Sequence, residues 1–463
     1  MGEEKINFEE EKLKKKSLKY SIYKGSSFSL MDGFGSRYLT PYAVSMNLSN
    51  TFISLLSTIP NFIGSLLQMK GLRIIEKRSR KKIVISGVLF QAFMWLPLIG
   101  VGAAYFFLNL NILISSILLV LIYTLLVAGG SFSGPAWSSW MRDLIPKDAV
   151  SYFGKRNSAV GVVSLASLLL AGAILSVFNE DKSFFGFAIL FFIAFLGRSL
   201  SGYLFTKHYE PKLEIKEGYY FSFFDFFKKM PKNNFGRFTI FSSLVTFATA
   251  IASPFFAVYM LRELGFSYFE FTLIIISSIF ANFIFQPFWG KFADKFGNIN
   301  VIKLCGFFIF LVPLLWFVSP LIFIQSKSFL ILYLFLVEFF SGFVWAGFDL
   351  STGTFAYYAV TKERLPLCST YMNVLISIGS FFGALLGGII SSSPGLIFGI
   401  SAFLFIFLLS AIMRFIVIQS LVSKLKETKK EVTEFKRDKI KEFFVGLISK
   451  EMNQGLGTKR IVD

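Results

Sequence analysis

Twelve long apolar segments make up most of this 463-residue chain. A helix needs about 20 predominantly apolar residues to cross a lipid bilayer, and every segment meets that length. Hydrophobic residues form 54% of the chain and charged residues only 16%, which is too apolar for a water-soluble fold. The sequence therefore predicts an all-α, polytopic membrane protein with twelve transmembrane helices. The segments are 20–44, 49–69, 82–106, 110–140, 157–178, 184–206, 237–260, 266–290, 301–324, 328–357, 366–390 and 395–422.

The basic residues alternate from loop to loop. The chain has 47 Lys and Arg against 28 Asp and Glu, a formal net charge of +19. Loops after even-numbered segments, taken with the first three residues of the segments that follow, hold 23 Lys and Arg, whereas the loops after odd-numbered segments hold 3. Because cytoplasmic loops collect Lys and Arg, we expect both termini in the cytoplasm and a lipid bilayer, not nucleic acid, as the partner of this charge. The N-terminal residues do not form a signal peptide pattern.

The longest internal loop separates six apolar segments from six others, which predicts two six-helix bundles. The motif Ser133-Gly134-Pro135-Ala136-Trp137 in the fourth segment is echoed by Ser341-Gly342-Phe343-Val344-Trp345 in the tenth. Such an echo, at what we expect to be the same place in each half, is typical of transporters built from repeated halves. The expected regions are an N-terminal bundle (1–206), a cytoplasmic linker (207–236), a C-terminal bundle (237–422) and a basic cytoplasmic tail (423–463).

The tail combines lysines with an apolar stripe. Its apolar residues recur every one to five positions, as on one side of a helix, so we expect a basic amphipathic helix on the anionic inner leaflet or against the cytoplasmic loops. A regulatory role is a further hypothesis. The residues are Lys424, Lys426, Lys429, Lys430, Val432, Phe435, Ile440, Phe443, Phe444 and Leu447.

The loop between the eighth and ninth segments carries a signature of two glycines, an aspartate and a lysine: Gly290, Asp294, Lys295 and Gly297. This pattern resembles the loop signature of the major facilitator superfamily. Asn298 and Asn300 stand where that family usually has basic residues.

Two further segments resemble the same family. The loop after the second segment keeps the basic cluster at Arg78, Arg80, Lys81 and Lys82 but lacks the aspartate. The segment that contains Arg142, Asp143 and Phe153 and ends at Asn157 also resembles a motif of that family.

The resemblance covers nearly the whole chain and implies a mechanism. It implies two pseudo-symmetric six-helix bundles that rock about a central cavity lined by the first, fourth, seventh and tenth segments. It also implies a gating role at the cytoplasmic face, in the inward-closed state. The implied gating residues are Gly290, Asp294, Lys295, Gly297, Arg78, Arg142 and Asp143; a simple helix cap at Asp294 is the alternative.

Charges inside the apolar segments are few, and such charges are usually functional or paired. Counting residues inward at about 1.5 Å each places Arg37 and Glu338 at depths where they could meet, so we expect a cross-half contact that closes the outer side or binds a polar substrate. Asp32 lies near the expected midplane and is the first candidate for proton coupling, with Glu338 and Asp349 as alternatives; a structural role in packing is the competing interpretation. The full set is Asp32, Arg37, Arg198, Glu338, Asp349 and Arg414.

Aromatic and small residues add weaker signals. Trp137 and Trp345 are candidates for stacking on a substrate ring, although Trp residues also anchor helices at the membrane interface. Gly379, Gly383 and Gly387 recur every four residues in the eleventh segment, which favours close helix packing.

The sequence lacks the motifs of several enzyme classes. His208 is the only histidine, and neither a Walker loop nor a Gly-x-Ser-x-Gly elbow is present, so we expect no enzyme, no metal and no cofactor. The predicted function is alternating-access secondary transport of a small organic solute, coupled to protons, by a monomer in the plasma membrane. Export of hydrophobic compounds is an alternative, although the fifth segment lacks the Gly-Pro signature of drug antiporters in this superfamily. A membrane sensor without transport is a further alternative.

Overall fold

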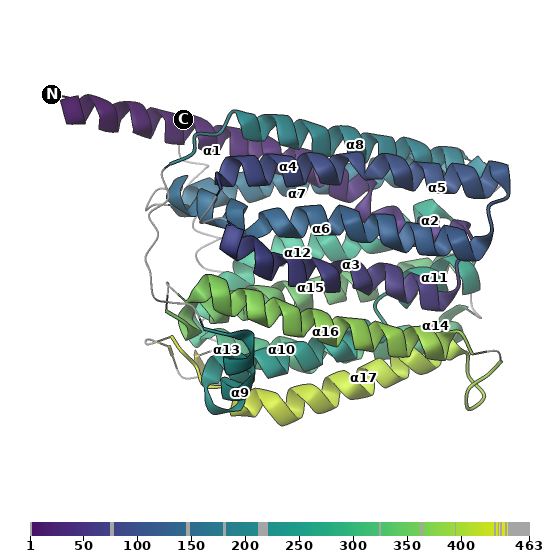
Figure 1. Cartoon of the computed structure of the whole chain (residues 1–463). Coiled ribbons are helices and arrows are strands. Elements are labelled where there is room, and N and C mark those ends of the chain that lie inside the picture. Colours follow the sequence, from purple (N-terminus) through teal and green to yellow (C-terminus); the bar gives the residue numbers. More distant parts are fainter. Residues whose placement is uncertain are drawn as a thin grey trace, which may run out of the picture.

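A computed structural model of the chain describes residues 2–74, 78–144, 149–178, 182–211, 221–323, 326–361, 364–393 and 395–429, together with 432, 433, 435, 438, 439 and 442. These residues form an all-α protein of long, roughly parallel helices (Figure 1). The all-α fold class is therefore confirmed.

The helices up to residue 206 pack mainly on one another. Among them α1 lies against α7 and α8, and α6 against α3 and α4. They are α1 (Gly2–Phe34), η1 (Ser36–Tyr38), α2 (Leu39–Ser45), α3 (Asn50–Ile74), α4 (Arg80–Phe93), α5 (Trp95–Leu108), α6 (Ile112–Leu144), α7 (Ala149–Val177) and α8 (Ser183–Thr206).

The later helices form a second group, in which α12 packs on α15 and α10 on α16 and α17. Two short linker elements, α9 (Phe223–Lys229) and η3 (Met230–Lys232), precede this group. Its members are α10 (Asn234–Ala250), α11 (Phe255–Val258), η4 (Tyr259–Glu263), α12 (Tyr268–Phe296), α13 (Asn298–Ile309), α14 (Leu311–Phe323), α15 (Lys327–Ala359), α16 (Leu365–Ser391), α17 (Ala402–Leu421) and η5 (Val422–Lys424).

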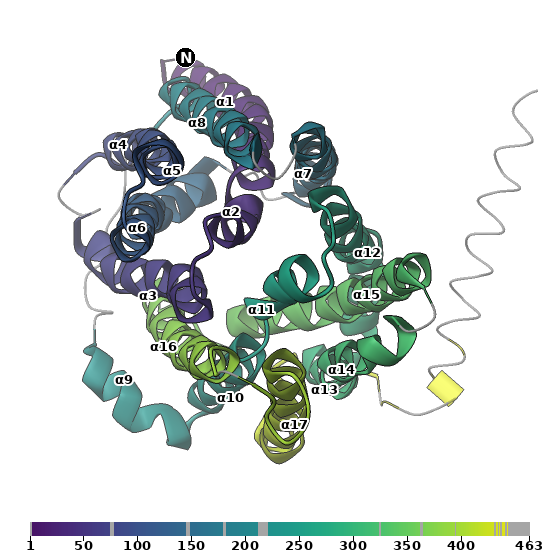
Figure 2. The same cartoon turned by 90° about the vertical axis from the view of Figure 1, so that its right-hand side faces the viewer.

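Eleven helical segments in the described part of the chain are long and apolar enough to cross a membrane. The first expected segment is the exception: its helix α1 is long enough but too rich in polar and charged residues, and it ends at Phe34, after which the chain continues through η1 into α2. Figure 2 views the molecule along its helices and shows α2 inside the ring that the other helices form. The break in the first segment thus places α2 at the centre of the bundle.

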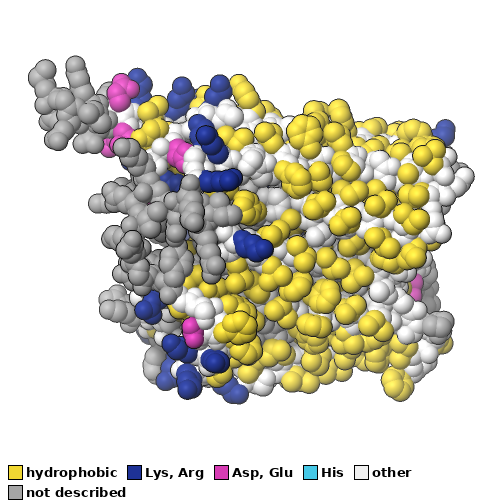
Figure 3. Space-filling view, in the orientation of Figure 1, with side chains coloured by type: hydrophobic (Ala, Val, Ile, Leu, Met, Phe, Trp, Pro, Cys, Tyr) yellow, Lys and Arg dark blue, Asp and Glu magenta, His cyan; other side chains and the backbone are white. Residues whose placement is uncertain are grey.

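The surface separates charge from apolar side chains. Hydrophobic residues cover most of the visible face, and Lys and Arg gather at the end of the bundle that also holds the N-terminus (Figure 3). We call this the basic end and the other the outer end. An apolar belt with basic residues at one end is the pattern expected of a membrane protein.

In the described part of the chain, most of the buried core that the two helix groups share lies toward the outer end. One core cluster there combines Tyr42 and Leu56 of the first group with Phe255 and Tyr259 of the second. Toward the basic end the described core divides into two clusters, one in each group. The halves are therefore closed on each other at the outer end and more separate at the basic end.

The echoed motifs do not occupy equivalent places. Both α6 and α15 have 33 residues, but Ser133 is residue 22 of α6 and Ser341 is residue 15 of α15. The motifs are thus about two helical turns out of register, and the expectation that they mark the same place in each half is wrong.

Close packing along α16 is confirmed. A Cβ added at Gly379, Gly383 or Gly387 would lie 2.1–2.3 Å from a backbone carbonyl oxygen of the segment that begins with α10. Without side chains, these glycines let the two backbones touch.

We predict that Gly383→Ala destabilises the protein, because the added Cβ would lie 2.2 Å from the carbonyl oxygen of Phe247 and one backbone must move. Overpacking of this kind costs about 1–3 kcal/mol. Thermal unfolding in detergent should show a lower midpoint. Gly100→Ala is the matched control, because a Cβ there meets nothing within 4 Å; equal midpoints for the two variants would contradict the prediction.

Candidate functional site

Hydrogen bonds between the two helix groups concentrate at the outer end. Arg262 donates to the side chain of Asn50 at 2.9 Å and to the carbonyl oxygen of Leu48 at 2.6 Å. The Tyr38 hydroxyl lies 2.6 Å from the Thr272 hydroxyl, which joins η1 to α12. These bonds and the shared core close the path to the outer end.

The ion pair of Asp32 and Arg37 lies where the first segment breaks. Arg37 Nε is 3.2 Å from an Asp32 carboxylate oxygen, and the two side chains are 49% and 29% exposed. Tyr123 of α6 lies beside the pair and is hydrogen-bonded to Ser36. Asp32 therefore is not the isolated carboxylate that we expected, because the turn through Gly35 brings Arg37 back onto it.

Glu338 is held within the second helix group. Its carboxylate accepts a hydrogen bond from Trp316 Nε1 at 3.0 Å and is bonded to the Ser278 hydroxyl, and the charge of Arg414 lies near. The expected Arg37–Glu338 contact is thus wrong in this structure. Similar depth along the membrane did not predict a contact, because Arg37 pairs with Asp32 and Glu338 with Trp316, each within its own half.

Asp349 is the third candidate acid and lies on α15. Its residue is exposed, and no described side chain is hydrogen-bonded to its carboxylate. Residues 345, 349 and 352 follow one another at helical spacing on one face of α15. Trp345 on that face is half-buried and packs edge-on against Phe348 at 5.5 Å. Asp349 and Trp345 therefore share a face that the neighbouring helices leave partly open.

Trp137 is covered by a buried lysine. Lys24 Nζ lies 3.8 Å from the centroid of a Trp137 ring and 4.8 Å from that of Phe205. Lys24 is only 7% exposed, and in the described part of the chain it has no carboxylate partner. The exposed ring face expected for substrate stacking is thus already occupied by a cation, which Trp binds well.

Arg80 and Asp143 connect α4 and α6 at the basic end. The buried Arg80 guanidinium lies 2.5 Å from an Asp143 oxygen and donates to the Pro211 carbonyl at 2.7 Å. Arg78, the arginine that we expected in a gating role, is exposed. The side chain of Arg142 lies outside the described residues. Asp143 thus has a structural partner in its own half.

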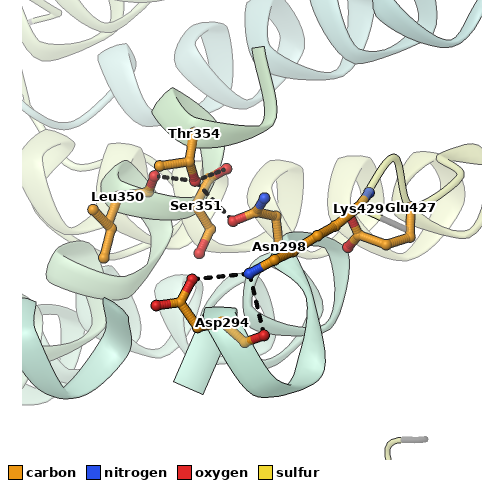
Figure 4. A network of polar contacts seen from close by, with 7 residues as sticks. All are labelled: Asp294, Asn298, Leu350, Ser351, Thr354, Glu427 and Lys429. Carbon is orange, nitrogen blue, oxygen red and sulfur yellow. Dashed lines mark hydrogen bonds and ion pairs between the residues drawn. The ribbon is translucent and has the colours of Figure 1, made fainter. Parts of the chain in front are cut away.

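The signature expected in a loop lies in the last two turns of α12 up to Gly297, and the chain's own tail contacts it. Figure 4 shows Lys429 Nζ on Asp294, at 2.9 Å from the carboxylate and 3.1 Å from its carbonyl oxygen. Lys295 contributes its carbonyl, which accepts from Thr433 N at 2.9 Å. Gly290, in contrast, has space for a Cβ, with only Leu350 at 3.7 Å.

Glu427 caps the helix that follows the signature. The α13 helix has no side-chain cap of its own because Gly297 precedes it. Instead a Glu427 oxygen accepts from Ile299 N at 2.9 Å. Gly297 has φ +87°, and a Cβ there would lie 2.6 Å from Glu427, so glycine is required both for the turn and for the approach of the tail.

After η5 the described part of the tail is helical only at 438, 439 and 442. The expected amphipathic helix is wrong for 432, 433 and 435, which are not helical, and Phe435 packs against Phe292 and Phe296. The rest of the expected stripe, Ile440, Phe443, Phe444 and Leu447, lies outside the described residues. Where it is described, the tail therefore docks on the end of α12 and the start of α13.

Sequence reasoning missed three residues of these networks, and it named Arg80 only as part of a basic cluster. Lys24 was visible as a charge within an apolar segment, and a complete count of such charges would have found it. Tyr123 and Glu427 carried no signal, because one tyrosine of 17 and one glutamate in a charged tail do not stand out. In the described residues no group of three His, Cys, Asp or Glu side chains is placed to hold a metal ion.

Docking of the tail predicts protection of the α13 N-terminus. Glu427→Ala removes the acceptor for Ile299 N, and loss of a helix cap costs about 1 kcal/mol, or about a fivefold change in an opening equilibrium. Hydrogen–deuterium exchange at Ile299 should become faster by about that factor. Lys424→Ala, an exposed tail residue without a described contact, is the control; unchanged exchange in Glu427→Ala would contradict the assignment.

The single histidine predicts a pH dependence of stability. Burial, together with the charges of Lys24 and Lys81, lowers the pKa of His208 from 6.5 to about 4, while its hydrogen bond to the Leu204 carbonyl opposes that shift. The unfolded chain then binds a proton between these values and the folded chain does not, so stability falls as pH drops from about 6.5 to 4. The loss can reach about 3 kcal/mol.

Thermal unfolding of wild type and His208→Asn between pH 7 and pH 4 tests this point. Asparagine can keep the bond to Leu204 but does not titrate in this range. The wild-type midpoint should fall more steeply with pH than that of the variant. Parallel curves would show that another group controls the acid sensitivity.

The comparisons with known proteins agree with this architecture. The family model described as Major Facilitator Superfamily matches residues 238–451. No curated protein sequence matches the chain significantly. Among solved structures, the nucleoside transporter NupG, in a mutant form, aligns with TM-score 0.66 at 15% identity and covers 89% of this chain and 100% of its own.

Two other solved structures are similar over nearly their full length. A D-xylose-proton symporter aligns with TM-score 0.66 at 12% identity and covers 91% of this chain and 99% of its own. A bacterial homologue of the human lysosomal transporter Spinster, in an inward-facing and occupied conformation, aligns with TM-score 0.64 at 14% identity, covering 89% and 98%. The second helix group thus matches the family model of the Major Facilitator Superfamily, and the chain as a whole shares the fold of these solved transporters.

Proposed function

We propose that this protein carries a small organic solute across the plasma membrane in symport with protons, as a monomer with both termini in the cytoplasm. The observation that carries the proposal is the partly exposed Asp32–Arg37 pair at the break of the first segment, in a bundle closed at its outer end. The basic end then faces the cytoplasm, as the distribution of Lys and Arg favours.

The ion pair offers a chemical basis for proton coupling. While Asp32 is ionised, it holds the Arg37 guanidinium at 3.2 Å. Protonation removes the negative charge and frees Arg37 to bind an oxygen of the solute, since guanidinium is a strong donor in a fixed geometry. Loss of the proton restores the pair and displaces the solute. The pair is exposed enough for a proton to reach it.

The facing half supplies a second polar surface. Asp349 on α15 has no described partner, and Trp345 on the same face offers an aromatic ring. Asp349 and Glu338 are the alternative proton sites; Glu338 is the weaker of the two because Trp316 and Ser278 already bind it.

The substrate class follows from this chemistry. A guanidinium, a carboxylate and a partly open Trp suit a polar solute with a ring, such as a sugar or a nucleoside, better than a hydrophobic drug. Similar structures include a nucleoside transporter and a D-xylose-proton symporter, which supports the same class.

Transport in reconstituted vesicles tests the proposal. Wild-type protein should accumulate one member of a panel of radiolabelled pentoses, hexoses and nucleosides when a proton gradient, inside alkaline, is imposed. Asp32→Asn should reduce this uphill accumulation at least tenfold and retain exchange of internal for external solute, because it removes the titrating group but not the binding surface.

Asp225→Asn is the matched control, since Asp225 lies on linker helix α9 and is hydrogen-bonded to Ser222. It should transport like wild type. If Asp32→Asn keeps gradient-driven accumulation and Asp349→Asn loses it, the proton site moves to Asp349. If no panel member is accumulated and none exchanges, the substrate class is wrong.

A further inference from the structure

A second, smaller site lies away from the centre, at the basic end of the first helix group. A pocket of about 290 Å³ opens there between the N-terminal part of α1, the start of α4 and the end of α8. Lys16, Lys81 and Lys207 line it, together with Tyr20 and Glu210. The volume suits a headgroup of a few non-hydrogen atoms, and the lining is predominantly cationic.

The single carboxylate that lines the pocket, that of Glu210, already accepts hydrogen bonds from the protein. Glu210 accepts from the Ser79 hydroxyl at 2.7 Å and from Lys81 N at 3.2 Å, so it caps the N-terminus of α4. Lys81 Nζ donates one hydrogen bond, to the His208 carbonyl at 2.8 Å, which leaves two of its three donors. The cationic charge of the pocket is therefore only partly compensated from within.

The other two lysines have no acid to pair with. Neither Lys16 nor Lys207 has a salt bridge to a carboxylate in the described part of the chain, and both are exposed. The Lys207 ammonium lies 5.2 Å from the ring centroid of Tyr203. Two exposed lysines without a described carboxylate partner thus line one small pocket.

The pocket continues into a lipid-facing apolar stripe. Phe192, Leu196, Leu200 and Tyr203 are 46–57% exposed and lie at helical spacing on one face of α8. This stripe ends one turn before Thr206 and Lys207 at the pocket. From Phe192 to Lys207 the helix rises about 22 Å, which is comparable to an extended acyl chain. A soluble anion would use the lysines but not the stripe.

We propose that the pocket binds the headgroup of an anionic phospholipid of the cytoplasmic leaflet, with its acyl chains along α8. The phosphate oxygens accept hydrogen bonds from Lys16, Lys81 and Lys207, as basic pockets between transmembrane helices do for lipid headgroups. The lipid then joins the basic ends of α1, α4 and α8, which all belong to the first helix group. This site is separate from the solute site and does not depend on the proposed transport function.

Lipid binding to the purified full-length chain tests the proposal. Native mass spectrometry and thermal unfolding in detergent are measured with phosphatidylglycerol, phosphatidylcholine and inorganic phosphate as separate probes. Phosphatidylglycerol should bind and raise the unfolding midpoint, and the other two should do so much less. The double variant Lys16→Gln/Lys207→Gln should bind phosphatidylglycerol about tenfold more weakly.

The control variant removes the same charge elsewhere. Lys182→Gln/Lys424→Gln alters two exposed lysines outside the pocket and should bind phosphatidylglycerol like wild type. Both double variants should unfold at similar temperatures without added lipid, which separates loss of binding from loss of fold. Three results would each overturn the proposal. They are equal binding of phosphatidylglycerol and phosphatidylcholine, a rise in the unfolding midpoint with inorganic phosphate equal to that with phosphatidylglycerol, and wild-type affinity of the pocket variant for phosphatidylglycerol.

Discussion

The structure depends on how a bundle of apolar helices accommodates the few charges that it buries. A lone charge in an apolar interior is costly, and in this chain most have a partner close by in the same half. Arg198 binds Gln91 at 2.7 Å, Arg414 donates to backbone carbonyls, and Lys24 lies on Trp137. Because these charges have partners within one half, the halves can move without breaking those contacts. The bonds of Arg262 to Asn50 and to the Leu48 carbonyl do cross between the halves and would have to reorganise.

The break in the first segment follows from the same constraint. A continuous helix would direct Asp32 and Arg37, five residues apart, toward different sides. The turn through η1 instead brings them to 3.2 Å, and it places α2 at the centre of the bundle. The polar pair that defines the candidate site is thus a product of an irregular backbone. Non-helical backbone within a membrane protein is tolerated where it is buried or lines a cavity.

The fold class and the membrane segments could be predicted from the sequence because length and hydropathy act locally. Side-chain pairing could not: Asp32, Arg37 and Glu338 were all identified as buried charges, but their partners depend on helix rotation and on a break that no periodicity signals. The Ser-Gly-x-x-Trp echo misled for a related reason. Three matching residues in five do not fix register, and the two motifs differ by two turns within helices of equal length. The tail's contacts were equally hidden, because they join residues more than 120 positions apart.

The tail changes how a latch at Asp294 would have to work. A latch between the halves needs the Asp294 carboxylate to reach the opposite half when the basic end closes. Here that carboxylate is 80% exposed but already bound to Lys429 of its own half. Exposed ion pairs contribute only about 0.2–1 kcal/mol, so an exchange of partners would be nearly balanced in free energy. The cap that Glu427 places on α13 and the packing of Phe435 do not involve that carboxylate. The tail can therefore stay docked while Asp294 changes partner, and its lysine then sets a small bias toward the conformation in which the basic end is open.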